Sequence, residues 1–245
     1  MNDFQVIAII PARSGSKGVV DKNIALLGEH PLLAFSIIAA QLAGVDRVIL
    51  STDSEEYAAI GRRYGAETPF IRPTAFSTDT STDLDFMKHA MVALQEHDGT
   101  VPEFWVHLRP TTPLRDPRVI NKAIIEISER IDATSLRSAH VAIESPFKWF
   151  LKDSHGYFEG LIPELTSADV NRPRQSFPPV YVPNGYVDVV RRSHVLDASE
   201  LHGNKMLVFE TQHCVEVDSP SELDLIRLHL DRDGSPLLSS LNRLS

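Results

Sequence analysis

A loop rich in glycine, serine and cationic residues follows the first apolar segment of the chain. Its sequence is Pro11-Ala-Arg-Ser-Gly-Ser-Lys-Gly18, continued by Val19-Val-Asp-Lys-Asn23. The small residues let the backbone approach an anion closely, with N–H groups free to donate. Arg13, Lys17 and Lys22 add three positive charges. The glycine spacing matches neither the P-loop nor the dinucleotide fingerprint, so no known phosphate motif identifies the loop. Two interpretations therefore stay open: an anion-binding loop, or a surface turn with solvated lysines.

A pair of carboxylates near the C-terminal end of the chain is a second candidate site. Glu216 and Asp218 are two residues apart, and such residues point to the same face of a strand. Magnesium prefers hard oxygen ligands and commonly takes one or two carboxylates together with phosphate and water. The pair therefore indicates either a Mg²⁺ site, with Asp218 and Glu216 as ligands, or an exposed strand end.

Alternating strands and helices must position these residues. Short apolar segments predict buried strands at Val6–Ile10, Arg47–Ser51, Phe104–Leu108, Thr134–Ser138 and Cys214–Val217. Apolar periodicity and capping signals predict helices at Leu32–Leu42, Glu55–Tyr64, Asp83–Gln95, Pro117–Arg130 and from Ser219 to about Arg232. This alternation predicts an α/β fold with a doubly wound, mostly parallel sheet covered on both faces. In such sheets, ligands bind beyond the carboxyl ends of the strands, where the cationic loop lies.

The segment Glu144–Tyr186 interrupts this alternation. It is rich in proline and aromatic residues and contains no strongly periodic helix. Elsewhere no flexible linker or low-complexity block divides the chain. We therefore predict a single domain over residues 1–245, with 144–186 as an inserted excursion that serves as a lid or a dimerisation arm.

The composition argues against several classes of function. The net charge of -9 argues against a general nucleic-acid surface, and no apolar run approaches the roughly 20 residues of a membrane helix. The N-terminal sequence lacks the features of a secretory signal. The lone cysteine, Cys214, excludes an internal disulfide framework. We expect a cytoplasmic protein that binds anions at local basic spots and has neither nucleic acid nor membrane as a partner.

The loop sequence IIPARSGSKGVVDKN resembles the first motif of the acylneuraminate cytidylyltransferases, the enzymes that make CMP-activated sialic acids. Later segments match in order, so the resemblance covers nearly the whole chain: STDS (51–54), Arg72-Pro73 with STDT (77–80), LRPTTPLR (108–115) and Asn184-Gly185. Val20 stands where the family usually has proline. The related 3-deoxy-manno-octulosonate cytidylyltransferases match less well. The resemblance implies a nucleotide-diphospho-sugar transferase-like fold.

The resemblance also implies which residues hold the nucleotide. Arg13 and Lys22 would contact the phosphates, Asn23 would help to hold the base, and Arg72 would line the cytosine and ribose pocket. The carboxylate of Asp83 has two interpretations, an acceptor for the exocyclic amine of cytosine or a helix-start residue. The full nucleotide-binding set is Ala12, Arg13, Ser14, Gly15, Ser16, Lys17, Lys22, Asn23, Arg72, Thr80 and Asp83.

On the acceptor side, the chain departs from the family at two positions. Arg109 stands where sialic acid enzymes usually carry glutamine, and Asp188 where they often place a tyrosine. Two opposite charges in one pocket indicate a mutual salt bridge or an altered sugar. For Arg109, the alternatives are a two-pronged grip on a substrate carboxylate and a structural ion pair. The implied substrate-binding set is Arg109, Thr111, Thr112, Lys148, Arg174, Asn184 and Asp188.

The reaction implied by the resemblance is transfer of CMP from CTP to the anomeric hydroxyl of a 2-keto-3-deoxy sugar acid, with release of pyrophosphate. Arg13, Lys22 and Asp218 would be the catalytic residues. The family's metal motif is Asp-x-Asp, and Glu216 replaces its first carboxylate, so Asp218 is the safer ligand for Mg²⁺. A homodimer is also implied. Two alternatives stay open: a sugar-1-phosphate nucleotidyltransferase of different base specificity, and a catalytically idle nucleotide-binding homologue.

Overall fold

A six-stranded sheet with the order β10-β6-β9-β5-β1-β4 forms the centre of the fold. The computed structural model describes residues 5–244. The parallel pairs are β1 with β4, β1 with β5 and β6 with β10, whereas β9 runs antiparallel to β5 and β6. The predicted mostly parallel sheet is confirmed. Its strands are β1 (Val6–Pro11), β4 (Arg47–Ser51), β5 (Phe104–His107), β6 (Ser135–Val141), β9 (Tyr181–Arg191) and β10 (Met206–Glu210).

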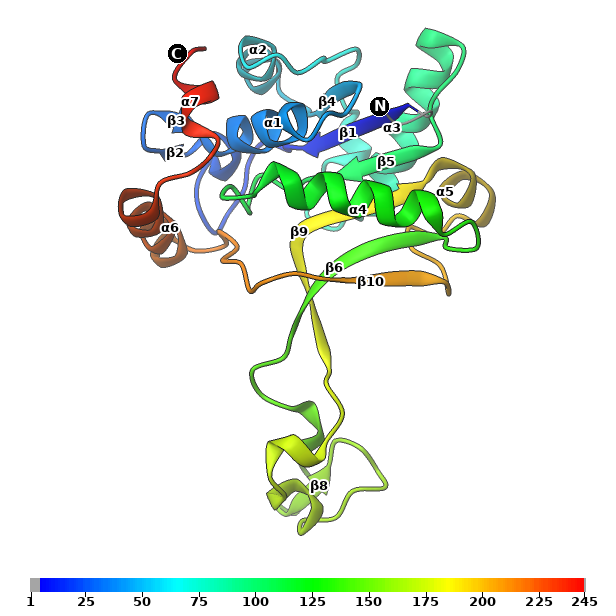
Figure 1. The fold of residues 1–245 in the computed structure, drawn as a ribbon, viewed down its shortest axis with the longest axis vertical. Helices are drawn as coiled ribbons and strands as arrows, with labels where there is room; N and C mark the ends of the chain where they lie inside the picture. The colour runs from blue at the N-terminus through cyan, green and yellow to red at the C-terminus, as the bar shows by residue number, and fades with distance from the viewer. Residues whose placement is uncertain (1–4, 245) are drawn as a thin grey trace.

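Helices cover both faces of this sheet, as Figure 1 shows. In β1, Val6, Ala8 and Ile10 face one apolar core, and Ile7 and Ile9 face the other, because successive side chains of a strand alternate. The first core is closed by α1 (Leu32–Leu42), α2 (Glu55–Arg63), α4 (Pro117–Glu129), α6 (Pro220–Asp233) and α7 (Leu238–Leu241), and the second by α3 (Asp83–Asp98) and α5 (Arg192–Ala198). None of the helices described between residues 5 and 244 is long and apolar enough to cross a membrane.

The predicted helices are confirmed, and the residues expected to cap them do so. Ser219 and Glu222 form a capping box at the start of α6, and Asp116 caps α4. Helix α3 runs three residues past its predicted end at Gln95, to Asp98, where Gly99 adopts a positive φ of 79° and ends it. Short elements complete this region: η1 (Lys22–Ile24), β2 (Leu26–Leu27), β3 (His30–Pro31) and η2 (Thr74–Phe76).

The strand predicted at Cys214–Val217 is wrong. This segment has no regular structure, and Val217 N–H donates to Thr111 O at 2.8 Å, which ties it to the loop after β5 rather than to a sheet edge. The strand next to β6 is instead β10, which precedes the predicted one. Residues after Glu210 leave the sheet, and the segment that carries Glu216 and Asp218 contacts the loops after β5 and β1, through Thr111 and Lys22.

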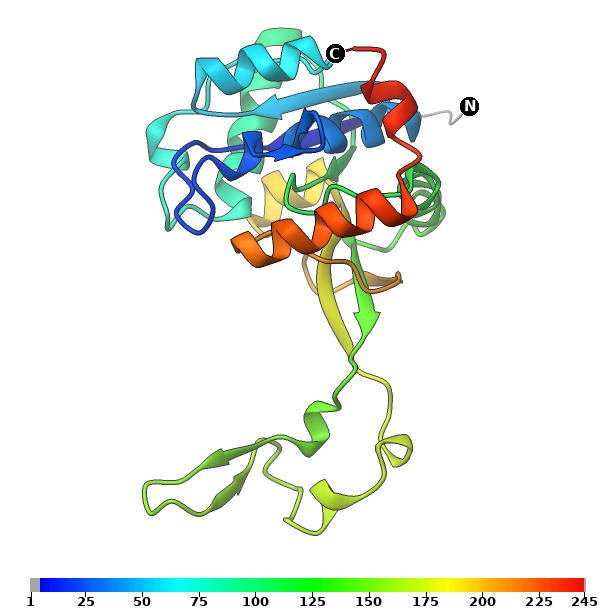
Figure 2. The same cartoon turned by 90° about the vertical axis from the view of Figure 1, so that its left-hand side faces the viewer.

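The residues between β6 and β9 leave the body as an arm, defined here as residues 142–180 (Figures 1 and 2). The arm overlaps the segment 144–186 singled out in the sequence, but residues 181–186 belong to β9, and Tyr181, Val182 and Pro183 pair with β6. Its regular elements are β7 (Phe150–Lys152), β8 (Phe158–Gly160), η3 (Pro146–Lys148), η4 (Asp169–Asn171) and η5 (Arg174–Ser176).

Candidate active site

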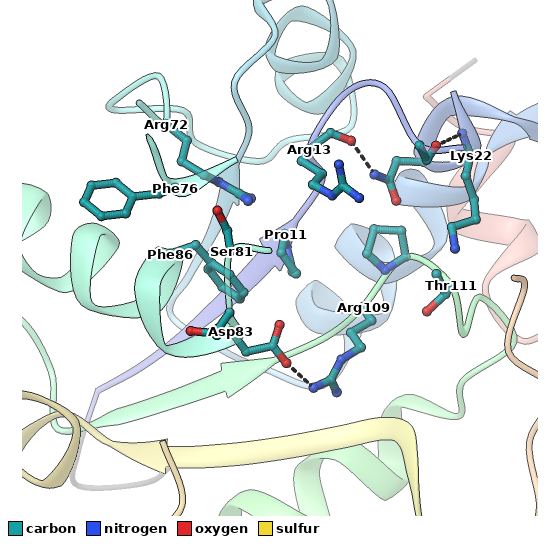
Figure 3. Close-up of a pocket in the computed structure, with 14 residues that line it drawn as sticks. Pro11, Arg13, Lys22, Arg72, Phe76, Ser81, Asp83, Phe86, Arg109 and Thr111 are labelled. Atoms are coloured by element: carbon teal, nitrogen blue, oxygen red, sulfur yellow. Dashed lines mark hydrogen bonds and ion pairs between the residues drawn. The ribbon is translucent and has the colours of Figure 1, made fainter. Parts of the chain in front are cut away.

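A cavity of about 230 Å³ lies beyond the carboxyl ends of β1 and β5, where a doubly wound sheet is expected to bind its ligand (Figure 3). One end carries the cations of the loop after β1, and the other carries aromatic rings and the start of α3. Its walls are formed by Pro11, Arg13, Ser16, Lys22, Asn23, Arg72, Phe76, Ser81, Thr82, Asp83, Phe86, Arg109, Pro110 and Thr111.

Hydrogen bonds hold the cationic loop in shape. The backbone N–H and hydroxyl of Ser14 donate to the Asp53 carboxylate at 2.7 and 2.9 Å. The Ser16 hydroxyl accepts from Lys22 N–H at 2.8 Å and donates to Val19 O at 2.9 Å. The loop is therefore fixed before any ligand arrives, which reduces the entropic cost of binding.

Carboxylates pair with the three cations of the loop. Arg13 Nη2 lies 3.0 Å from Asp79 Oδ1, and Lys17 also binds Asp79. These two cations lower the pKa of the Asp79 carboxyl, with Lys17 the larger cause. Lys22 Nζ lies 2.8 Å from Asp218 Oδ1. A polyphosphate at this loop would meet Arg13 and Lys17 in the place of Asp79.

The opposite end of the cavity is aromatic and holds a buried guanidinium. Arg72 is 4% exposed, and its Nε donates to Ser51 Oγ at 3.0 Å. The guanidinium carbon lies 5.0 Å from the centre of the Phe86 ring. Burial lowers the pKa of Arg72 to about 10, so the side chain stays charged at neutral pH. Phe76 and Phe86 make this end of the cavity apolar.

The carboxylate of Asp83 is not used to cap its helix. Thr82 caps α3, and Asp85 completes the capping box. Asp83 Oδ2 instead accepts from Arg109 Nη2 at 2.6 Å (Figure 3). The predicted salt bridge between Arg109 and Asp188 is also confirmed, with Arg109 Nη1 donating to Asp188 Oδ2 at 3.0 Å. Arg109 therefore connects two carboxylates.

The two candidate metal carboxylates have different surroundings. Glu216 Oε1 accepts from Gly185 N–H at 2.7 Å, which fixes this side chain against β9. Asp218 is 69% exposed as a side chain and touches Lys22. A Cβ added to Gly18 would lie only 2.5 Å from Asp218 O, so the loop packs directly on this segment. Within residues 5–244, no group of three or more His, Cys, Asp or Glu side chains is arranged to hold a metal ion.

The cavity brings together many of the residues singled out in the sequence: Arg13, Ser16, Lys22, Asn23, Arg72, Asp83, Arg109 and Thr111. Others lie beside the cavity without forming its wall: Ala12, Ser14, Gly15 and Lys17 on the loop, Asp218 on Lys22, Glu216 on Gly185 and Asp188 behind Arg109. Thr80 lies on an exposed loop, where its hydroxyl is 3.1 Å from that of Thr78.

The remaining substrate candidates lie outside this cavity. Thr112 is buried behind Thr111, and Asn184 is buried within β9, where its amide bonds to Ser138 and Thr211. Two further candidates, Lys148 and Arg174, are on the arm, which extends away from the body (Figure 2). Lys148 Nζ donates to Arg172 O at 2.9 Å, and an Arg174 guanidinium nitrogen donates to Ala142 O at 2.8 Å.

Sequence reasoning missed several residues that build this site. Asp53 holds the loop, Ser51 holds Arg72 and Asp79 binds two loop cations. All three belong to the STDS and STDT segments, so their membership of these two motifs was the available signal. Arg115, the last residue of the LRPTTPLR segment, was also missed. It is fully buried and binds four acceptors, Ser36 Oγ and the carbonyl oxygens of Arg109, Gly185 and Tyr186.

A doubly wound sheet with a preformed cationic loop after β1 and an aromatic wall opposite it defines a class of α/β proteins that bind phosphorylated, ring-bearing ligands. Residues 7–149 match the family model described as cytidylyltransferase, and the chain belongs to this family.

Two relatives support this assignment, and one solved structure shows the same fold. The N-acylneuraminate cytidylyltransferase of Escherichia coli O18:K1:H7 is 30% identical over 224 residues, covering 90% of this chain and 51% of that protein. The chain thus spans about half the length of this relative. The CMP-N,N'-diacetyllegionaminic acid synthase of Campylobacter jejuni is 30% identical over 221 residues, with coverages of 90% and 92%. The structure of CMP:2-keto-3-deoxy-manno-octonic acid synthetase complexed with CTP has a TM-score of 0.68 at 16% identity, covering 94% of this chain and 99% of that one, which shows the shared fold.

Proposed function

We propose that the chain transfers CMP from CTP to the anomeric hydroxyl of a 2-keto-3-deoxy sugar acid of the nonulosonic acid class, releasing pyrophosphate. The observation that carries this proposal is the convergence of Arg13, Lys22 and Asp218 at the carboxyl end of β1 in a chain of the cytidylyltransferase family. Relatives named for N-acylneuraminate and N,N'-diacetyllegionaminic acid support the choice of acceptor class.

The two ends of the cavity bind different parts of CTP. The triphosphate lies along Arg13, Lys17 and Lys22, whose charges offset the negative charge that builds up as the acceptor oxygen attacks the α-phosphorus and pyrophosphate leaves. The nucleoside lies toward Arg72 and Phe86, where the buried guanidinium and the ring fix its position. Most of the rate acceleration then comes from alignment and charge neutralisation.

A divalent cation, Mg²⁺ by its preference for oxygen ligands, fits this site through Asp218. The Asp218 carboxylate is exposed beside the loop cations, and the nucleotide phosphates and water would complete the coordination. When bound, the ion would stabilise charge on the phosphates. Glu216 is a second oxygen donor, but its bond to Gly185 N–H makes it the weaker candidate ligand.

The backbone contact between Gly18 and Asp218 leads to a prediction. Gly18→Ala should weaken CTP binding roughly tenfold or more, because the added Cβ would meet Asp218 O at 2.5 Å and push the loop and the carboxylate apart. Isothermal titration with CTP and Mg²⁺ measures the effect. Gly61→Ala is the control, since its Cβ meets the Leu50 side chain in the core and should lower stability without lowering CTP affinity. Unchanged CTP affinity in Gly18→Ala would contradict this prediction and show that CTP does not bind at the contact between the loop and Asp218.

The arm supports a homodimer. It exposes large apolar side chains that a solvated surface does not explain: Trp149 is 49% exposed, Phe150 61% and Tyr157 73%. Since Lys148 and Arg174 lie on the same arm, outside the cavity of their own chain, dimerisation through the arm would bring them to the sugar acid in the partner's cleft.

Replacing Phe150 with serine should therefore shift the protein from dimer to monomer. The substitution removes apolar surface from the proposed interface. Within the chain the Phe150 ring packs on Phe158 of the neighbouring strand β8, on the arm and away from both cores, so the fold of the body should persist. Light scattering coupled to size-exclusion chromatography at micromolar concentration reads the mass directly. Ile131→Ser, at an apolar side chain of the body that is 90% exposed, should leave the dimer intact. A wild-type monomer would refute the dimer.

A panel assay tests the proposed function. Purified protein with Mg²⁺ is given each of the four nucleoside triphosphates and three sets of acceptors: nonulosonic acids, 3-deoxy-manno-octulosonate and sugar 1-phosphates. Pyrophosphate release with CTP and a nonulosonic acid is the expected result. Release only with a sugar 1-phosphate would identify a different nucleotidyltransferase. The absence of release with every pair would indicate a nucleotide-binding protein without this activity.

A further inference from the structure

Arg109 lies between two carboxylates on different elements of the fold. Its Nη2 is 2.6 Å from Asp83 Oδ2 at the start of α3, and its Nη1 is 3.0 Å from Asp188 Oδ2 on β9. Its own carbonyl oxygen accepts from Arg115 Nη2 at 2.7 Å, so the backbone is fixed as well. Each terminal nitrogen of the guanidinium thus uses one N–H on a carboxylate. The two carboxylates also balance the positive charge of Arg109, which weakens its attraction for a further carboxylate on the acceptor.

Asp188 does not reach the cavity. It is fully buried in β9, directly opposite His107 of β5 and Arg137 of β6 in the strand register. Arg109 is its hydrogen-bonded cation, whereas Arg137 Nε lies 3.8 Å away. A carboxylate at this depth is stable only beside a compensating charge, so Asp188 and Arg109 anchor each other.

Asp83 is the member of this group that faces the ligand. It forms part of the cavity wall, and its side chain is 40% exposed. Because Thr82 and Asp85 cap the helix, the carboxylate is free for another role. A fixed carboxylate accepts hydrogen bonds and repels phosphate, so its partner is a neutral donor group. On CTP, such donors are the exocyclic amine of cytosine and the ribose hydroxyls.

We propose that Arg109 is a positioning residue for the nucleotide rather than a ligand for the acceptor: anchored by Asp188, it holds Asp83 so that the Asp83 carboxylate accepts a hydrogen bond from the nucleoside of CTP. The inference rests on the proposed function. It assigns the Asp83–Arg109–Asp188 network to nucleotide recognition, and it leaves the sugar-acid carboxylate to other cations.

A double-mutant cycle on CTP affinity tests this network. Asp83→Asn and Arg109→Gln should each raise the Kd for CTP roughly tenfold, and the double variant should be no weaker than the worse single one, because both changes remove the same hydrogen bond. Arg109→Lys should behave like Arg109→Gln, since one ammonium cannot hold two carboxylates in a fork. The acceptor KM should stay within about twofold of wild type in all of them.

Further measurements identify which group of CTP donates the hydrogen bond and allow for a variant that does not fold. Loss of discrimination between CTP and UTP in Asp83→Asn would assign the amine, and loss between CTP and dCTP would assign a ribose hydroxyl. Arg47→Gln, which breaks two ion pairs at the edge strand β4, is the control and should leave CTP affinity unchanged. Arg109→Gln leaves the buried Asp188 without its hydrogen-bonded cation. If that variant unfolds, CTP affinities of Asp83→Asn and Arg109→Lys test the proposal.

A rise of tenfold or more in acceptor KM at unchanged CTP affinity in Arg109→Lys or Arg109→Gln would overturn the inference and make Arg109 an acceptor ligand. Additive effects of the two single changes, or unchanged CTP affinity in Asp83→Asn, would overturn it too. A wild-type protein that binds no CTP would refute the proposed function itself, which separates that failure from failure of the network.

Discussion

Replacing Asp218 with alanine should reduce kcat/KM for CTP by roughly 100- to 1,000-fold while leaving the protein folded. The side chain is 69% exposed and bonds to Lys22 alone among its hydrogen-bonded and ionic partners in residues 5–244, so its loss removes little packing. Under the proposed function, the variant would lack the anionic oxygen that would hold the divalent cation beside the loop cations. Pyrophosphate release measures the activity, and thermal unfolding measures the fold.

Asp224→Ala provides the matched control for that experiment. Asp224 is an aspartate on α6, 70% exposed, which bonds to Arg227 and lies outside the cavity wall. It should keep wild-type rates. A wild-type rate in Asp218→Ala would remove Asp218 from the site, and an unfolded variant would show that the carboxylate has a structural role.

Among the variants proposed for this protein, replacing Arg115 with methionine should produce the largest loss of stability. Burial lowers the pKa of Arg115 to about 10, yet the guanidinium stays charged and donates to Ser36 Oγ and three carbonyl oxygens. Methionine retains much of the apolar volume but removes the donor to the carbonyl oxygens of Gly185 and Tyr186, at about 1–3 kcal/mol for each buried group. Arg109 O keeps Thr112 N–H and Ser36 Oγ as donors. We expect the free energy of unfolding to fall by at least about 3 kcal/mol, and the thermal midpoint by roughly 6–12 °C.

Two further variants serve as references for the thermal midpoint of Arg115→Met. Arg115→Lys keeps the charge but has one donor centre in place of the fork, so its midpoint should lie between those of wild type and Arg115→Met. Arg118→Met, at an arginine whose side chain is 87% exposed, should leave the midpoint unchanged. If Arg115→Met melts with the wild type, the carbonyl oxygens of Gly185 and Tyr186 do not depend on Arg115.

The sequence predicts the body of the fold because its signals are local. Apolar runs and caps locate β1, β4, β5 and β6 and all the longer helices. The signals for β9 and β10 are weaker or misleading. Pro183, Asn184 and Gly185 are typical of a turn, yet they lie inside β9, and β6 accommodates them through a register shift between Arg137 and Ala139. β10 is an edge strand whose exposed Met206 and Val208 show no buried pattern.

The candidate site follows the same division. Sequence motifs identified the loop cations, Arg72 and Asp218 one by one, and the topology brought them to one end of the sheet. The contact between Arg109 and Asp188 was predicted from two coupled departures from a family pattern. Its extension to Asp83 was not, because that contact depends on how the start of α3 docks on the end of β5. Long-range docking of this kind leaves no periodicity in the sequence.

A crystal structure of the protein with CTP and Mg²⁺ tests the central claim most directly. We expect phosphate oxygens at hydrogen-bond distance, about 3 Å, from the side chains of Arg13 and Lys22, with Asp79 displaced from Arg13 and the metal on Asp218. We also expect the nucleoside to lie against Arg72 and Phe86. A triphosphate bound away from the loop after β1, with Asp79 still on Arg13, would contradict it.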